Sequence, residues 1–125
     1  MRTALVIDDN RHMGDLLAQI VALFDFKVDV AYGSRIALSR LKINTPTIVF
    51  LDLLMPGVSG FEVLAYLKRE PRLMNVPVIV VTSDDQAETR EKAKAAGVVD
   101  FIPKPATFEI IEAALKKLEL TNQNE

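Results

Sequence analysis

Side chains that could do chemistry follow four of the five short apolar segments of this 125-residue sequence. In chain order they are Asp8 and Asp9, then Asp52, then Thr82 with Ser83, and finally Lys104-Pro105. Clustered carboxylates repel one another unless a cation or a proton intervenes, and hard oxygen ligands of this kind suit Mg²⁺. A carboxylate beside such a cation can attack a phosphoryl group, whose oxygens a lysine and a hydroxyl can bind. The spacing therefore indicates phosphoryl chemistry, provided that the fold brings these residues together.

Each of these residues has a simpler interpretation when it is taken alone. An aspartate after a strand often caps a helix or a turn, and a lysine is often a solvated surface charge. The functional interpretation depends on all four segment ends, because ligands of open parallel sheets bind outside the carboxyl ends of the strands. The only histidine, His12, is interpreted as a polar surface residue beside Asp8 and Asp9.

The elements that must position these residues alternate between two periods. Short runs rich in β-branched residues predict strands at 4–7, 28–31, 48–51, 76–81 and 98–102. Between them, apolar residues three and four apart predict helices near 13–24, 34–41, 61–67, 86–96 and 108–118. Ser34 and Thr107 are the expected caps of two of these helices. Five strand–helix alternations predict an α/β domain with a parallel sheet and right-handed crossovers.

The fourth predicted helix has an unusual apolar side, made of alanines. Alanine favours helix but buries little area, so we expect weak attachment to the core. This helix is either a plain surface element or one that is free to shift. The domain is predicted to span residues 1–120, and residues 121–125 are predicted to form a polar tail.

Composition excludes several classes of site. The net charge of -2 gives no overall attraction to nucleic acid or anionic lipid. The absence of cysteine excludes disulfides and thiolate metal sites, and a single histidine cannot form a multi-histidine metal site. The first apolar run is too short for a signal peptide or a membrane span. We therefore expect a cytoplasmic domain that contacts neither membrane nor nucleic acid directly.

The motifs in their order resemble the receiver domain of two-component response regulators, with single-domain chemotaxis regulators as the nearest type. They are Asp8-Asp9, the run Asp52-Leu-Leu-Met-Pro-Gly-Val-Ser-Gly60, Thr82-Ser83 and Phe101-Ile-Pro-Lys104-Pro105, within about residues 3–118. The resemblance implies a flavodoxin-like three-layer sandwich, with five helices around a doubly wound five-stranded parallel sheet in the order 2-1-3-4-5.

The resemblance also implies a role for each site residue. Asp52 is the expected phospho-acceptor. Mg²⁺ is expected on Asp9, Asp52 and the backbone carbonyl of Leu54, with Asp8 acting through water. Thr82 and Lys104 are expected to bind the phosphoryl oxygens, Thr82 and Phe101 to form the switch, and the bond to Pro105 to be cis. Two departures from the family pattern, Ser83 for alanine and Phe101 for tyrosine, leave this chemistry in place.

The implied function is a signalling switch and not an enzyme that acts on separate substrates. A sensor histidine kinase or a histidine phosphotransfer protein would donate the phosphoryl group. The surface formed by the fourth helix, fifth strand and fifth helix would contact a downstream effector or a second copy of the chain. An aspartate-nucleophile phosphatase is a weaker alternative, because such enzymes carry an acid where this sequence has Leu54. A non-phosphorylated scaffold is also weaker, since all five site positions are present.

Overall fold

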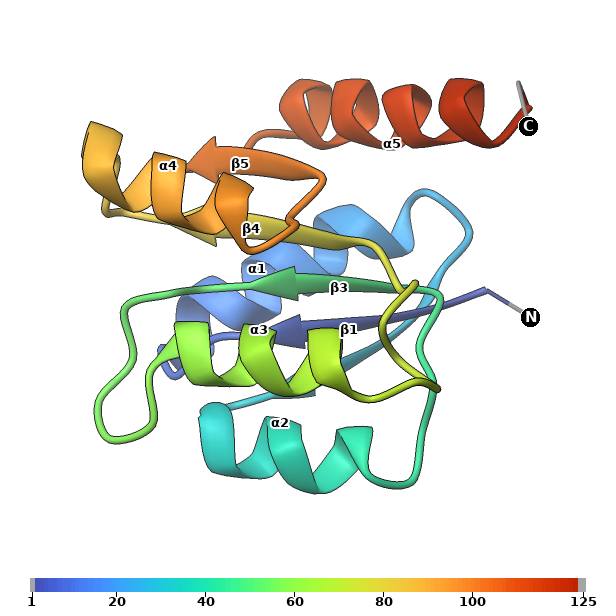
Figure 1. The fold of residues 1–125 in the computed structure, drawn as a ribbon. Helices are drawn as coiled ribbons and strands as arrows, with labels where there is room; N and C mark the ends of the chain where they lie inside the picture. The colour runs from blue at the N-terminus through green and yellow to red at the C-terminus, as the bar shows by residue number, and fades with distance from the viewer. Residues whose placement is uncertain (1, 124–125) are drawn as a thin grey trace.

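The fold is an alternating α/β arrangement around one parallel sheet. A computed structural model describes residues 2–123, and the side chains of residues 2–119. Its elements are β1 (Thr3–Ile7), α1 (Arg11–Ala22), β2 (Lys27–Ala31), α2 (Ser34–Leu41), β3 (Ile48–Leu51), α3 (Gly60–Arg69), β4 (Val78–Thr82), α4 (Ala87–Ala95), β5 (Asp100–Pro103) and α5 (Phe108–Gln123). The strands lie in the order β2-β1-β3-β4-β5 (Figure 1), which confirms the predicted order and fold class.

Two buried apolar layers cover the two faces of the sheet. Alternate strand residues point to opposite faces, so Leu5 and Ile7 enter one layer while Ala4 and Val6 enter the other. The first layer packs against α2, α3 and α4, and the second packs against α1 and α5. All residues of β3 and β4 are buried, which explains their continuously apolar sequences.

Four predicted boundaries are corrected by the structure. Strand β4 begins at Val78 and not at residue 76, because Val76 and Pro77 form the connection before it. Strand β5 begins at Asp100, because Gly97 has φ +95° and the Val98 N–H bonds back to Ala93 O in α4. Helix α5 extends to Gln123, so residues 121–123 are helical and not the tail that was expected; residues 124–125 lie outside the described residues.

The fourth correction concerns Ser34, which does not cap α2. Gly33, with φ +117°, is the residue before the helix, and Ser34 is the first helical residue with its side chain buried. Thr107 does cap α5, because its Oγ1 accepts a hydrogen bond from the Ile110 N–H at 3.3 Å.

Helix α4 has one buried residue, Ala93, as its alanine-rich sequence indicates. Among the described residues, none of the helices has the length and apolar character that a bilayer crossing requires.

Candidate functional site

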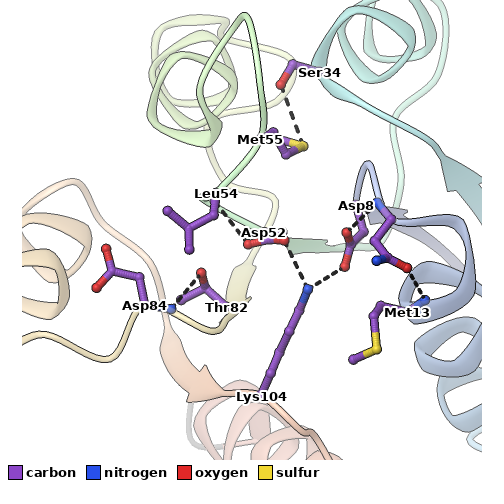
Figure 2. Close-up of polar contacts among 10 residues, drawn as sticks. Asp8, Met13, Ser34, Asp52, Leu54, Met55, Thr82, Asp84 and Lys104 are labelled. Atoms are coloured by element: carbon purple, nitrogen blue, oxygen red, sulfur yellow. Dashed lines mark hydrogen bonds and ion pairs between the residues drawn. The ribbon is translucent and has the colours of Figure 1, made fainter.

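The candidate site lies at the carboxyl ends of three parallel strands. Asp8 follows β1, Asp52 follows β3 and Lys104 follows β5. Strands β1 and β3 are neighbours with Ile7 paired to Leu51, so the two aspartates emerge side by side. The Lys104 side chain extends toward both of them (Figure 2). The sheet topology thus joins residues that are 52 and 96 positions apart in the sequence.

Lys104 bridges two buried carboxylates. Its Nζ lies 2.7 Å from Asp8 Oδ2 and 3.0 Å from Asp52 Oδ2, with the Asp8 and Asp52 side chains only 3% and 6% exposed. Burial lowers the pKa of Lys104, but the hydrogen bonds and charges of the two carboxylates outweigh that effect and leave the pKa above its ordinary value. The ammonium is therefore held protonated between the two acids.

Burial also perturbs the acid on β1. It raises the pKa of Asp8 above the ordinary value, although the hydrogen bonds from Lys104 and from the Asn10 N–H oppose the change. The negative charge of Asp52 is the smallest of the contributing causes. Desolvation, and not repulsion between the acids, is thus the main reason why Asp8 holds its proton more tightly.

The acidic cluster has the donor set of a divalent cation site. Asp8, Asp9 and Asp52 each offer one carboxylate oxygen, and these atoms all lie within 4.8 Å of one another. The backbone orients the buried pair: the Asn10 N–H donates to Asp8 Oδ1 at 2.9 Å, and the Leu54 N–H donates to Asp52 Oδ1 at 3.0 Å. Asp9 is exposed and open to water. Three carboxylates and one ammonium leave two negative charges, which a hard divalent ion such as Mg²⁺ would balance.

Thr82, expected at the same site, makes its hydrogen bond elsewhere. The side chain is fully buried, and its Oγ1 accepts a hydrogen bond from the Asp84 N–H at 3.3 Å. The Asp84 carboxylate in turn accepts from the Gln86 N–H at 3.2 Å and from the Thr89 hydroxyl at 2.8 Å. This chain of contacts joins the end of β4 to the first turns of α4.

Phe101, the other expected switch residue, lies in β5. It is partly buried against the layer that contains α2, α3 and α4, and the Arg90 guanidinium lies over its ring at 4.8 Å from the centroid. The Lys104–Pro105 peptide bond is cis, as predicted. His12 is exposed in the first turn of α1, as expected for a surface residue, and Ser83 is exposed as well.

Two contacts around the site were not predicted from the sequence, where Ser34 was expected only as a helix cap and Asp84 was given no role. Ser34 donates from α2 to the Val58 carbonyl in the β3–α3 loop, and Asp84 connects Thr82 to α4. Ser34 gave no pattern that could reveal its partner 24 positions away. Asp84 could have been noticed as an Asx-turn residue before a helix.

The family model for the response regulator receiver domain matches residues 4–116. The chain belongs to this receiver domain family. Curated relatives of the receiver domain include "Response regulator MprA" of Mycolicibacterium vanbaalenii, 31% identical over 114 residues that cover 91% of this chain and 48% of the relative. Another is "Heme response regulator HssR" of Staphylococcus saprophyticus, 30% identical over an aligned region of 131 residues that covers 100% of this chain and 56% of the relative. The receiver domain therefore spans about half the length of these relatives.

Solved structures share the fold of this receiver domain. The chemotaxis protein CheY4 of Vibrio cholerae superposes with a TM-score of 0.86 at 21% identity, over 94% of this chain and 98% of that chain. A CheY-like receiver domain protein of Methanospirillum hungatei gives 0.87 at 21% identity, over 100% and 99%. At these identities the likeness concerns the fold alone.

Proposed function

We propose that this receiver domain accepts a phosphoryl group on Asp52 from a phosphohistidine of a partner protein. One observation carries the proposal: Asp52 is a buried carboxylate that has carboxylate oxygens of Asp8 and Asp9 within 4.8 Å and the Lys104 ammonium 3.0 Å from its Oδ2. An Asp52 oxygen would attack phosphorus, the bond from phosphorus to the imidazole nitrogen would break, and the imidazole would leave with the electron pair. Mg²⁺, when bound, supplies positive charge that offsets the repulsion between the carboxylate and the phosphoryl oxygens.

The residues around Asp52 would each take a separate part. Asp9, Asp52 and the Leu54 carbonyl are the proposed ligands of Mg²⁺, with Asp8 acting through water. Lys104 is already within hydrogen-bond distance of Asp52, so a short movement would bring its ammonium to a phosphoryl oxygen. The Thr82 hydroxyl accepts from the Asp84 N–H and keeps its own proton to donate, so a movement of this side chain toward Asp52 would bring that proton to the same group and stretch the bond from Asp84.

A signalling switch fits the site better than an enzyme that hydrolyses small phosphate esters. Aspartate-nucleophile phosphatases place an acid two residues after the nucleophile to protonate the leaving group. That position is Leu54, whose half-exposed side chain has no proton to donate. A scaffold without phosphorylation would have no use for a buried pair of carboxylates, whose desolvation is costly.

The proposal extends to partners and location. A cytoplasmic sensor histidine kinase or histidine phosphotransfer protein would supply the phosphoryl group. The face formed by α4, β5 and α5 would contact an effector or a second copy of the chain, because α4 is anchored by a single buried alanine and carries Arg90 over Phe101. The domain itself would bind neither nucleic acid nor membrane.

The test is intact mass after incubation with acetyl phosphate and Mg²⁺. The parent protein should gain one phosphoryl group that survives acid and is removed by hydroxylamine, as an acyl phosphate should be. Asp52→Asn should gain none, whereas Asp85→Asn, which changes an exposed aspartate, should behave like the parent. Equal labelling of Asp52→Asn and the parent would contradict the assignment.

A further inference from the structure

The loop between β3 and α3 carries both Asp52 and the Leu54 carbonyl, so its conformation shapes the acidic site. Its two ends are held by hydrogen bonds between residues of the loop and its borders. The Leu54 N–H donates to Asp52 Oδ1 at 3.0 Å, and the Gly60 N–H donates to the Leu53 carbonyl at 3.3 Å. Between these ends, Pro56 and Gly57 are exposed, and Gly57 adopts φ +76°. The middle of the loop therefore needs support from another element.

Ser34, the first residue of α2, supplies that support. Its side chain is buried, its hydroxyl donates to the Val58 carbonyl, and its Oγ lies 3.7 Å from Met55 Sδ (Figure 2). A serine hydroxyl has one proton, and the carbonyl is the stronger acceptor of the two. Among residues 2–123, no other hydrogen bond joins residues 54–58 to a different element.

Apolar packing acts on the same segment. Met55 belongs to the buried layer that also contains Ala37 and Leu41 of α2. Packing alone is non-directional, whereas the bond from Ser34 to Val58 fixes the orientation of one peptide group in the loop. Without the hydroxyl, the Val58 carbonyl would lose its partner, and the loop would be free to sample other conformations.

We propose that Ser34 is a positioning residue of the acidic site: by holding the Val58 carbonyl it keeps the β3–α3 loop in the conformation that binds a divalent cation, although Ser34 itself touches neither cation nor phosphoryl group. This inference rests on the proposed function, because it assigns Leu54 and Asp52 to the cation. It predicts an effect on metal affinity and not on the phosphoryl transfer step once metal is saturating.

The experiment measures Mg²⁺ binding by isothermal titration calorimetry for the parent protein, Ser34→Ala, Ser34→Thr and Ser59→Ala. Ser59 is the matched control, since it lies in the same loop and makes no side-chain capping hydrogen bond. Ser34→Ala should raise the dissociation constant for Mg²⁺ about three- to tenfold, the effect of one neutral hydrogen bond, which equals about 0.7–1.4 kcal/mol. Ser34→Thr keeps the hydroxyl and should restore most of the affinity, and Ser59→Ala should match the parent.

Two further readouts separate positioning from a general loss of stability. Amide hydrogen exchange should accelerate at residues 54–59 of Ser34→Ala while β1 and β3 keep the protection of the parent. The Mg²⁺ concentration for half-maximal labelling by acetyl phosphate should rise with the dissociation constant, and the rate at saturating Mg²⁺ should stay within about twofold of the parent. If Ser34→Ala does not fold, Ser34→Gly gives the same test in a smaller side chain.

Equal Mg²⁺ affinity in Ser34→Ala and the parent would overturn the inference while leaving the proposed function intact. So would a loss of affinity of the same size in Ser59→Ala, because the effect would then not belong to the Ser34 hydroxyl. Failure of the parent itself to bind Mg²⁺, or to be labelled at Asp52, would overturn the proposed function along with the inference.

Discussion

At the scale of single residues, the site depends on one lysine placed between two buried acids. Lys104 contacts Asp8 and Asp52 at hydrogen-bond distance. The exposed fractions of the three side chains are 15% for Lys104, 3% for Asp8 and 6% for Asp52. Removing one member of such a cluster leaves uncompensated charge, which typically costs about 3–5 kcal/mol. If Asp52 is phosphorylated as proposed, the same arrangement would place an ammonium beside the phosphoryl group.

Alkaline pH should weaken the metal-free fold through Lys104. Burial lowers the pKa of this lysine, but the hydrogen bonds and charges of Asp8 and Asp52 have the larger effect, so the pKa lies above its ordinary value. The folded state then holds the proton more tightly than the unfolded chain does. The stabilisation is complete below the unfolded pKa and disappears as the pH rises through the folded pKa.

Urea unfolding in EDTA between about pH 9 and about pH 12 measures this effect. The free energy of unfolding of the parent should fall more steeply with pH than that of Lys104→Met. Parallel curves for the two proteins would show that the ion pairs do not contribute in this way.

Two helical glycines should respond differently to alanine. A Cβ at Gly60 would collide with the Asp52 carbonyl oxygen and lie 2.6 Å from Leu53 Cα, whereas a Cβ at Gly14 would meet Val30 Cγ1 at 3.2 Å. Gly60→Ala should therefore destabilise the protein by about 2–3 kcal/mol and displace the loop beside Asp52. Gly14→Ala should be close to neutral, because about 1 kcal/mol of improved helix propensity offsets the shift of Val30. Chemical denaturation of both variants tests the contrast, and equal costs would contradict it.

At the scale of elements, α4 is the helix with the fewest attachments to the core. It has one buried residue, Ala93. Two polar contacts connect it to the strands: Thr89 donates to Asp84, which is bonded to Thr82 at the end of β4, and Arg90 lies over the Phe101 ring in β5. A hydroxyl that leaves Asp84 would loosen the first of these connections. Helix α4 is thus the element that a change at Thr82 would move most easily.

Phosphorylation of Asp52 should alter amide hydrogen exchange in residues 82–104. In Thr82→Ala, phosphorylation should no longer cause that change in exchange. The variant keeps Asp52 and Lys104, so it should still be labelled by acetyl phosphate. It lacks the hydroxyl that would move from Asp84 toward the phosphoryl group, so the exchange of α4 and β5 should change little on labelling. Exchange of the phosphorylated and unphosphorylated forms of both proteins is the measurement. Changes confined to α1, or equal in the two proteins, would refute this route.

At the scale of the whole molecule, one edge of the sheet collects charge from distant parts of the chain. Asp8, Asp52 and Lys104 meet only when β1, β3, β4 and β5 are paired. A cation that binds this edge therefore binds the folded state and not the unfolded chain. Binding of that kind stabilises the fold by mass action.

Mg²⁺ should raise the free energy of unfolding by about 2.7 kcal/mol at a hundredfold excess over its dissociation constant. Asp9→Ala should lose most of this gain because it lacks one proposed ligand. Since Asp9 is exposed, the stability of Asp9→Ala without metal should equal or exceed that of the parent protein without metal. Thermal and urea unfolding with Mg²⁺ and with EDTA provide the comparison. Equal stabilisation of both proteins by Mg²⁺ would contradict the assignment of Asp9.

Local sequence patterns determined the order and type of the elements and the residues that end each strand. Asp8, Asp52, Thr82 and Lys104 follow apolar runs whose period marks them as strands, and that information lies within a few neighbouring residues. The strand order came from the resemblance to receiver domains and not from the periods. The predicted starts of β4 and β5 were wrong because of the backbone conformation before each strand. Pro77 belongs to the connection before β4, and the positive φ of Gly97 lets Val98 complete the turn after α4.

Only the tertiary structure decided which partners the site residues have. The Lys104 ammonium lies between two acids 52 and 96 positions away, the Ser34 hydroxyl donates to a carbonyl 24 positions away, and the Thr82 hydroxyl accepts from the Asp84 N–H. These contacts depend on strand pairing and on the depth at which each side chain is buried, and neither quantity has a local signature in the sequence. Burial also explains why the raised pKa of Asp8 is chiefly an effect of desolvation, since the distance of a carboxylate from water is a property of the folded molecule.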